Sequence, residues 1–119
     1  MRDFLLVFIG GGLGSVLRFI FNRLIPDGSF PYSTLTVNMV GSFLIGIIIG
    51  YLISNNMLKS DYYYFLIIGI CGGFTTFSAF SIESIILLKQ GKILLMASYI
   101  FLSSLLGITF CIIGMMFIK

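Results

Sequence analysis

The stretch GICGGFTTFSAFSIE, residues 69–83, decides the fold that this sequence predicts. It lies inside a long apolar segment, and near its centre the glycines Gly72 and Gly73 come shortly before the β-branched threonines Thr75 and Thr76. Such an order of residues makes a poor α-helix. A helix that is broken inside a membrane exposes backbone groups that lipid cannot satisfy, so the break must face a cavity or an ion. A plain kink at the glycine pair is the alternative for this segment alone.

Three further apolar segments surround this one, and each is long enough to cross a bilayer, which takes about 20 residues. The four predicted transmembrane helices are 4–25, 32–53, 62–88 and 93–118. Short polar connections with turn-forming residues separate them. The sequence therefore predicts an all-α integral membrane protein with one four-helix transmembrane domain over residues 1–119. Both termini are expected on the same side, and the third helix is expected to be broken at mid-membrane.

The composition indicates that lipid is the main solvent of the chain. Of its 119 residues, 59% are hydrophobic and only 9% are charged, whereas a soluble domain carries far more charge. The sequence has no histidine and no cluster of carboxylates or thiols, which leaves no transition-metal site, catalytic triad or histidine proton relay. We therefore expect a multi-pass protein of the cell (plasma) membrane that contacts lipid, is not an enzyme and binds no nucleic acid.

Positive charges are almost evenly balanced between the two predicted membrane surfaces. On the side of the termini lie Arg2, Lys59 and Lys119, and on the other side lie Arg23, Lys89 and Lys92, with Arg18 deeper in the first helix. Because lysine and arginine in the loops orient a membrane protein, this balance indicates insertion in both directions and pairing with an inverted copy. Four helices are also too few to hide a polar path from lipid, which favours an antiparallel, dual-topology homodimer.

Polar side chains recur on one face of the second and fourth predicted helices. Thr34, Asn38 and Ser42 are spaced four residues apart, as are Tyr99 and Ser103, and this spacing places each set on one helical face. Most of these residues fall in the half of the membrane nearer the first and third loops. Each subunit is therefore expected to furnish one polar half-path, and an inverted partner would furnish the other.

Two phenylalanines, Phe77 and Phe80, follow the break and point in similar directions. Neutral amide and hydroxyl donors, together with the electropositive edges of aromatic rings, suit a small anion that must exchange water for hydrogen-bond donors. No acidic residue lies near the bilayer centre, so a cation or proton path has no obvious carboxylate. The residues alone thus indicate an anion path without naming the anion, and ordinary packing of the two rings is the alternative.

Three motifs run in the same order through nearly the whole chain: GGGLGSVLRF at 10–19, STLTVNMVGSFLIG at 33–46 and GICGGFTTFSAFSIE at 69–83. They resemble the motifs of the Fluc (CrcB) family of fluoride channels. The resemblance implies a passive, fluoride-selective channel that exports fluoride and relieves its toxicity. It further implies a dual-topology dimer with two fluoride pores and a central structural sodium ion.

The same resemblance assigns roles to individual residues of this sequence. The backbone carbonyls of Gly72 and Thr75 from both subunits would hold the sodium ion. The fluoride pore would be lined by Asn38, Phe77, Phe80, Tyr99 and Ser103, with Thr34 and Ser78 as further candidates. Three positions depart from the family's pattern, namely Ser33 in place of a glycine, Ala79 in place of a hydroxyl residue, and Gly107 where a hydroxyl would extend the polar track of the last helix.

Two charged residues, Arg18 and Glu83, approach the membrane surface on the same side in the predicted arrangement. Snorkelling of their side chains to the interface is one interpretation. The other is that Arg18 lines an anion-attracting vestibule and that Glu83 pairs with it.

A small multidrug-resistance transporter, with proton-coupled transport, is the alternative function, since such proteins are also short, four-helix and dual-topology. That chemistry needs a glutamate inside the first helix, which this sequence lacks. It also leaves the break in the third helix unexplained. A membrane assembly factor without transport activity is a further alternative, but it would need neither the break nor the aligned polar faces.

Overall fold

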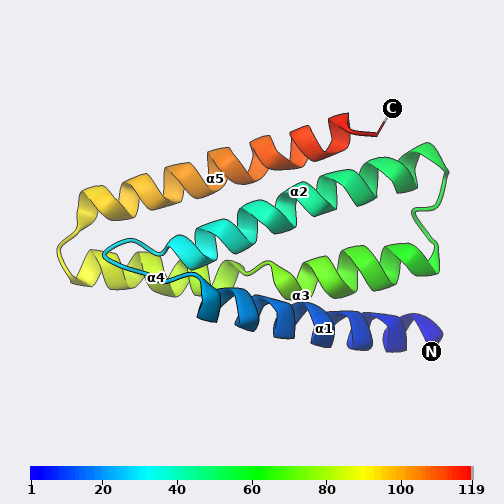
Figure 1. The fold of residues 1–119 in the computed structure, drawn as a ribbon, viewed down its shortest axis with the longest axis horizontal. Helices are drawn as coiled ribbons and strands as arrows, with labels where there is room; N and C mark the ends of the chain where they lie inside the picture. Colours follow the sequence, from blue (N-terminus) through cyan, green and yellow to red (C-terminus); the bar gives the residue numbers. More distant parts are fainter. Residues whose placement is uncertain (119) are drawn as a thin grey trace.

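The computed structural model describes residues 1–118 and places four long apolar helices side by side (Figure 1). Three are continuous: α1 (Arg2–Leu24), α2 (Tyr32–Ser54) and α5 (Ile93–Met116). The third span, Tyr63–Lys89, is divided into η1 (Tyr63–Cys71), α3 (Gly72–Phe74) and α4 (Phe77–Lys89). All four are long and apolar enough to cross a membrane, and their bounds differ from the predicted ones by two residues at most. Lys119, assigned above to the side of the termini, lies outside the described residues.

Two extended residues interrupt the third span, as the sequence predicts. Thr75 and Thr76 have ψ angles of 153° and 124°, which no helix contains. Thr75 ends the first half, because its amide and its hydroxyl both donate to the carbonyl of Cys71, at 3.0 and 2.9 Å. Thr76 starts the second half as the N-cap of α4, where its hydroxyl accepts from the amide of Ala79 at 3.2 Å. The break therefore falls at the threonines, and a simple kink at the glycines, which stay helical in α3, is wrong.

The first half of this span has a feature that the sequence did not predict, a π-helix over Tyr63–Cys71. Its backbone lies against two buried glycines of α1, Gly10 and Gly14. A methyl group added to Gly14 would overlap the carbonyl of Ile70, so the two backbones are already in contact. Close contacts of the same kind join α2 to α5, where Gly46 faces the carbonyl of Cys111.

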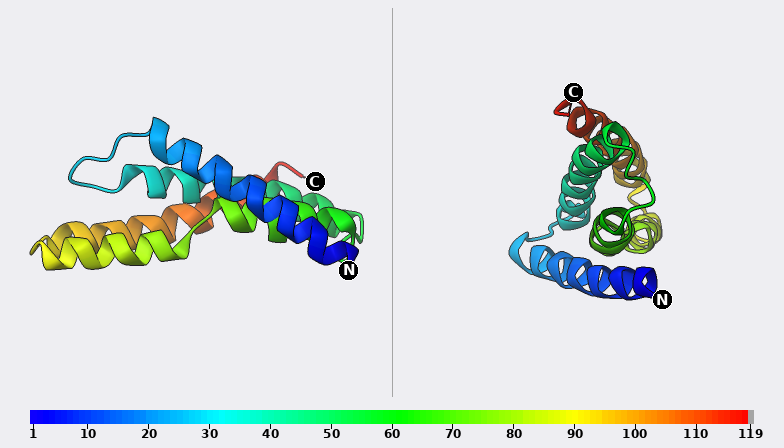
Figure 2. Two further views of the ribbon diagram at one scale, coloured as in Figure 1. Left: turned by 90° about the horizontal axis from the view of Figure 1, so that it is seen from below. Right: turned by 90° about the vertical axis from the view of Figure 1, so that its right-hand side faces the viewer.

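The arrangement separates two ends of the molecule (Figures 1 and 2). The start of α1 and the end of α5 lie at one end together with the α2–η1 connection, and the loops that follow α1 and α4 lie at the other. α2 packs mainly on α5, whereas α1 packs mainly on η1 and α3. Large apolar side chains such as Phe4 and Phe8 point outward, 75% and 79% exposed, as expected for a surface that lipid covers. The polar residues singled out in the sequence gather in the half with the α1–α2 and α4–α5 loops.

Candidate functional site

Asn38 on α2 joins that helix to the break in the third span. Its side-chain Nδ2 donates to the carbonyl of Thr76 at 3.0 Å, and its Oδ1 accepts from the amide of Thr76 at 2.9 Å. Both bonds satisfy backbone groups that the extended segment takes out of the helix. The amide has a second N–H that these bonds do not use. Asn38 thus fixes the break and still has one donor for a ligand.

Two shallow cavities adjoin each other beside the hydrogen bonds between Asn38 and Thr76, and both are lined by Asn38, Thr76 and Phe77. The first has a volume of about 250 Å³ and is lined by Asn38, Ser42, Ile45, Thr75, Thr76 and Phe77. The second, of about 200 Å³, is lined by Asn38, Thr76, Phe77, Phe80, Ser103 and Ser104. Residues from α2, the break, α4 and α5 therefore lie together along these two cavities. The surface that lines both cavities is called the strip below. Of the predicted pore residues, Asn38, Phe77, Phe80 and Ser103 lie together here.

An aromatic row continues from the break toward the loops. The ring centroids of Phe77 and Phe80 are 5.5 Å apart, those of Phe80 and Tyr99 5.1 Å, and those of Tyr99 and Phe30 5.4 Å. Tyr99 is fully buried, whereas Phe77 is 78% exposed. Aromatic rings present a weakly positive edge, so a row of them is compatible with a small anion beside it. The exposure of Phe77 leaves this side of the strip uncovered by the chain itself.

Ser103 on α5 has a buried hydroxyl without a hydrogen-bond partner among residues 1–118. Its neighbour Ser104 behaves as serines in helices often do and donates to the carbonyl of Ile100 at 2.9 Å. A buried hydroxyl without a partner costs about 1–3 kcal/mol. Because Ser103 lines the second cavity, a ligand or a water molecule there would remove that cost.

Glu83 on α4 lies beyond this strip and accepts two hydrogen bonds from residues that the sequence placed on the path. The hydroxyl of Thr34 donates to Oε1 at 2.6 Å, and that of Tyr99 donates to Oε2 at 3.0 Å. Thr34 and Tyr99 therefore turn their hydroxyl protons toward a carboxylate. The last pore candidate, Ser78, is exposed and lies 3.2 Å from the hydroxyl oxygen of Thr76.

Arg18 and Glu83 do not form the predicted pair, since the described chain contains no ion pair between them. Arg18 instead donates from Nε to the carbonyl of Gly73 at 3.1 Å, next to the break. The reason is the packing order of the helices: α1 contacts the first half of the third span, whereas α4 faces α2 and α5. Sequence spacing gives the depth of both residues but not the side of the span on which each one lies.

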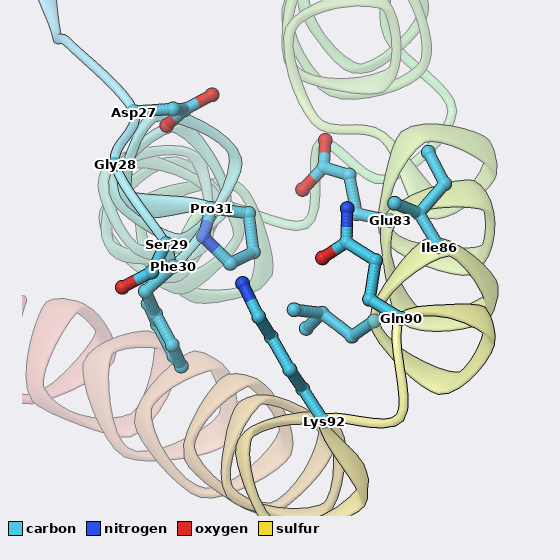
Figure 3. A pocket seen from close by; sticks show the side chains of 10 residues that line it. Asp27, Gly28, Ser29, Phe30, Pro31, Glu83, Ile86, Gln90 and Lys92 are labelled. Carbon is cyan, nitrogen blue, oxygen red and sulfur yellow. The ribbon is translucent and has the colours of Figure 1, made fainter.

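A third cavity, of about 230 Å³, opens at the loop end and reaches Glu83 (Figure 3). Its polar lining residues are Asp27, Ser29, Glu83, Gln90 and Lys92. In Figure 3 the amine of Lys92 and the amide of Gln90 point into it, toward the loop that joins α1 and α2. Sequence reasoning missed Asp27, Gln90 and Lys92 as site residues, because they fall in connections where charge and polarity are usual.

Asp27 also holds the start of α2. Its Oδ1 accepts from the amide of Ser33 at 2.8 Å, and its Oδ2 accepts from the Ser33 hydroxyl at 3.0 Å. Ser33, one of the departures from the family's pattern, lies in the first turn of α2, and its free amide is capped by this carboxylate. The loop wall of the cavity is thereby fixed to the helix that carries Asn38.

The carbonyls of Gly72 and Thr75 were assigned to sodium by resemblance. Within the described residues neither accepts a hydrogen bond, and Gly72 is exposed on the surface of the chain. No group of three or more acidic, cysteine or histidine residues in the described part of the chain is placed to hold a metal ion. Free backbone carbonyls are ligands that hard cations accept. The donor set therefore fits a sodium ion, although two carbonyls alone do not fill a coordination shell.

Comparison with known proteins identifies the family of this chain. Residues 5–115 match the family model described as CrcB-like protein, Camphor Resistance (CrcB). The chain is 45% identical to the fluoride-specific ion channel FluC of Flavobacterium psychrophilum, over 91% of its own length and 90% of the relative's. It is 44% identical to FluC of Phocaeicola vulgatus, over 96% of both chains, and 41% identical to FluC of Gloeothece citriformis, over 100% and 98%. With a match that covers almost every residue from the first helix to the last, the chain belongs to the CrcB family of membrane proteins.

Proposed function

We propose that this protein is a fluoride-selective ion channel that lets fluoride leave the cell passively and so relieves fluoride toxicity. The observation that carries the proposal is the near-full-length identity to proteins named fluoride-specific ion channel FluC. The chemistry of the strip beside the break supports it. A desolvated fluoride ion needs hydrogen-bond donors, and the strip offers the unused hydroxyl of Ser103, the second N–H of Asn38 and the ring edges of Phe77 and Phe80.

We infer that two copies associate in opposite orientations and form two pores. The support is that one chain leaves the path open to lipid: Phe77 is 78% exposed, and Gly72 and Ser78 are exposed at the depth of the break. Polar groups at that depth need protein or water around them. The balanced positive charges allow either orientation, so an inverted second copy would cover the open side of each strip.

A structural sodium ion at the dimer centre is part of the same proposal. The carbonyls of Gly72 and Thr75 from one subunit and the same pair from its partner would together supply four oxygens. When bound, the ion would supply positive charge that neutralises the carbonyl dipoles of the two breaks. Within each chain, Asn38 and Arg18 hold the backbone around those carbonyls, through Thr76 and Gly73.

The test is ion efflux from liposomes that hold the purified protein, with fluoride and chloride electrodes read in parallel. Rapid fluoride release without chloride release, and without a proton gradient, is the expected result. Protein-free liposomes are the control. Absence of fluoride flux from correctly folded dimers would overturn the functional proposal. A proton-coupled multidrug transporter finds no support, because the acidic residue of α1 is Asp3 in its first turn and not a glutamate inside the span.

A further inference from the structure

Ser42 on α2 lies opposite Gly107 on α5. A Cβ atom built on Gly107 would be 3.7 Å from Ser42 Oγ, which is ordinary van der Waals contact. Gly107 lies one turn after Ser103, at the position where the four-residue spacing of Tyr99 and Ser103 meets no hydroxyl. The hydroxyl of Ser42 on α2 therefore faces the backbone of α5 at Gly107, where α5 has no side chain.

Ser42 belongs to the strip beside the break. It lines the cavity of about 250 Å³ together with Asn38, Thr75, Thr76 and Phe77. It follows Asn38 by four residues on the same face of α2, so the line of polar side chains on that face extends from Asn38 to Ser42. Ser103 lies in the adjoining cavity, on the other side of the shared residues Asn38 and Phe77.

The hydroxyl of Ser42 is not used by its own helix. Ser54, also on α2, donates to the carbonyl of Gly50 at 2.9 Å, which is the bond that serines in helices commonly form. The Ser42 hydroxyl forms no hydrogen bond with any residue in the described part of the chain. Its proton is free to turn toward whatever occupies the cavity.

We propose that Ser42 is a further hydrogen-bond donor on the fluoride path, supplied by α2 at the depth where Gly107 leaves α5 without a hydroxyl. The inference rests on the proposed function, because it names one further group that a fluoride ion meets. A fluoride ion needs one hydroxyl at the depth of Ser42 and Gly107, and either α2 or α5 can supply it. A hydroxyl on α2 facing a glycine and a hydroxyl on α5 facing an alanine would then be equivalent.

The test is a transplantation of the hydroxyl from one helix to the other, read as fluoride efflux from liposomes. Ser42→Ala should lower the flux about tenfold or more, the effect of losing one hydrogen bond to a charged ligand. Ser42→Thr should retain the flux. The double variant Ser42→Ala with Gly107→Ser should recover it, since the added Cβ fits in ordinary contact and the alanine leaves room for the new hydroxyl.

Ser54→Ala is the matched control, since it removes a hydroxyl from the same helix that is already bonded to Gly50, and it should leave flux unchanged. Elution as a dimer and the thermal unfolding midpoint should be the same for all variants. Unchanged flux in Ser42→Ala would overturn the inference, and so would a loss of flux that Gly107→Ser does not restore. In either case the wild-type flux, measured beside it, would leave the proposed function standing, whereas absent wild-type flux would reject the channel itself.

Discussion

The phenol of Tyr99 donates a 3.0 Å hydrogen bond to Glu83, sixteen residues away in the chain. Glu83 accepts a second bond, of 2.6 Å, from Thr34, so one carboxylate ties α4 to both α5 and α2. Glu83 also lines the loop cavity, and Tyr99 belongs to the aromatic row, so this junction joins the two. It also explains why Glu83, in α4, is no partner for Arg18, whose side chain donates to Gly73 in α3.

Tyr99→Phe should destabilise the protein. The substitution keeps the ring contacts with Phe80 and Phe30 but leaves one oxygen of Glu83 without its donor. We expect a loss of about 1–3 kcal/mol in the free energy of unfolding. Thermal unfolding in detergent measures it. Tyr64→Phe is the control, because no hydrogen bond to that hydroxyl is seen in the described chain, and equal unfolding midpoints for the two variants would contradict the role of the bond.

Asn38→Asp should abolish fluoride flux. The aspartate keeps an oxygen for the amide of Thr76 but loses the N–H that reaches the Thr76 carbonyl, and it places a negative charge beside the path. Like charge repels the anion strongly where water is excluded. Efflux from liposomes is the measurement, with Asn55→Asp as the control, since Asn55 is exposed beyond the end of α2. Flux close to wild type in Asn38→Asp would place the path elsewhere.

Gly14→Ala should loosen the contact between α1 and the π-helical half of the third span. The added methyl group would overlap the carbonyl of Ile70, and backbone must shift to admit it. We expect a cost of about 1–3 kcal/mol in the free energy of unfolding. Gly12→Ala is the matched control on the same helix, because no atom lies within 4 Å of its added Cβ, and alanine there should stabilise the helix by about 0.5–1 kcal/mol. Unfolding midpoints that rise for both variants would contradict the packing.

Lys92→Gln should lower the fluoride flux at low ionic strength and have little effect at high ionic strength. Lys92 points into the loop cavity and forms no ion pair with any described residue, so its charge is available to attract anions to that end of the path. Salt screens this attraction, with a Debye length of about 30 Å at 0.01 M and about 8 Å at 0.15 M.

We expect a decrease of about two- to fivefold at 0.01 M salt, because a single charge supplies only part of the roughly ten- to thousandfold that a whole charged surface produces by steering. Lys89→Gln removes the same charge from a residue that does not line the cavity, and it should change the flux less. The idea is wrong if both lysine variants respond to salt in the same way.

The spans and the break were predictable because each depends on a local property. Apolar length fixed the helices to within two residues, and the two threonines after the glycine pair marked the interruption. The shared face of Asn38 and Ser42 likewise follows from helical spacing. The close contacts of Gly14 and Gly46 join helices within one chain, and which helices they join depends on the packing of the whole fold.

The partners of the charged residues were not predictable, because they depend on which helices flank the third span on each side. The sequence places Arg18 and Glu83 near the same membrane surface, yet Arg18 donates to the carbonyl of Gly73 and Glu83 accepts from the hydroxyl of Thr34. The bond from Asp27 to Ser33 depends on how one loop folds back. The π-helix arises where η1 lies against α1, and no single residue type signals it.

Within the break of the third span, Thr75 ends one helix and Thr76 caps the start of the next, and this bears on how the chain folds in the membrane. The amides of Thr75, Thr76 and Ala79 all find acceptors within one chain. The break can therefore form while a single chain is on its own in the bilayer. The carbonyls of Gly72 and Thr75 accept no hydrogen bond from the described residues, so a lone chain carries two unsatisfied acceptors at this depth until water, an ion or another protein reaches them.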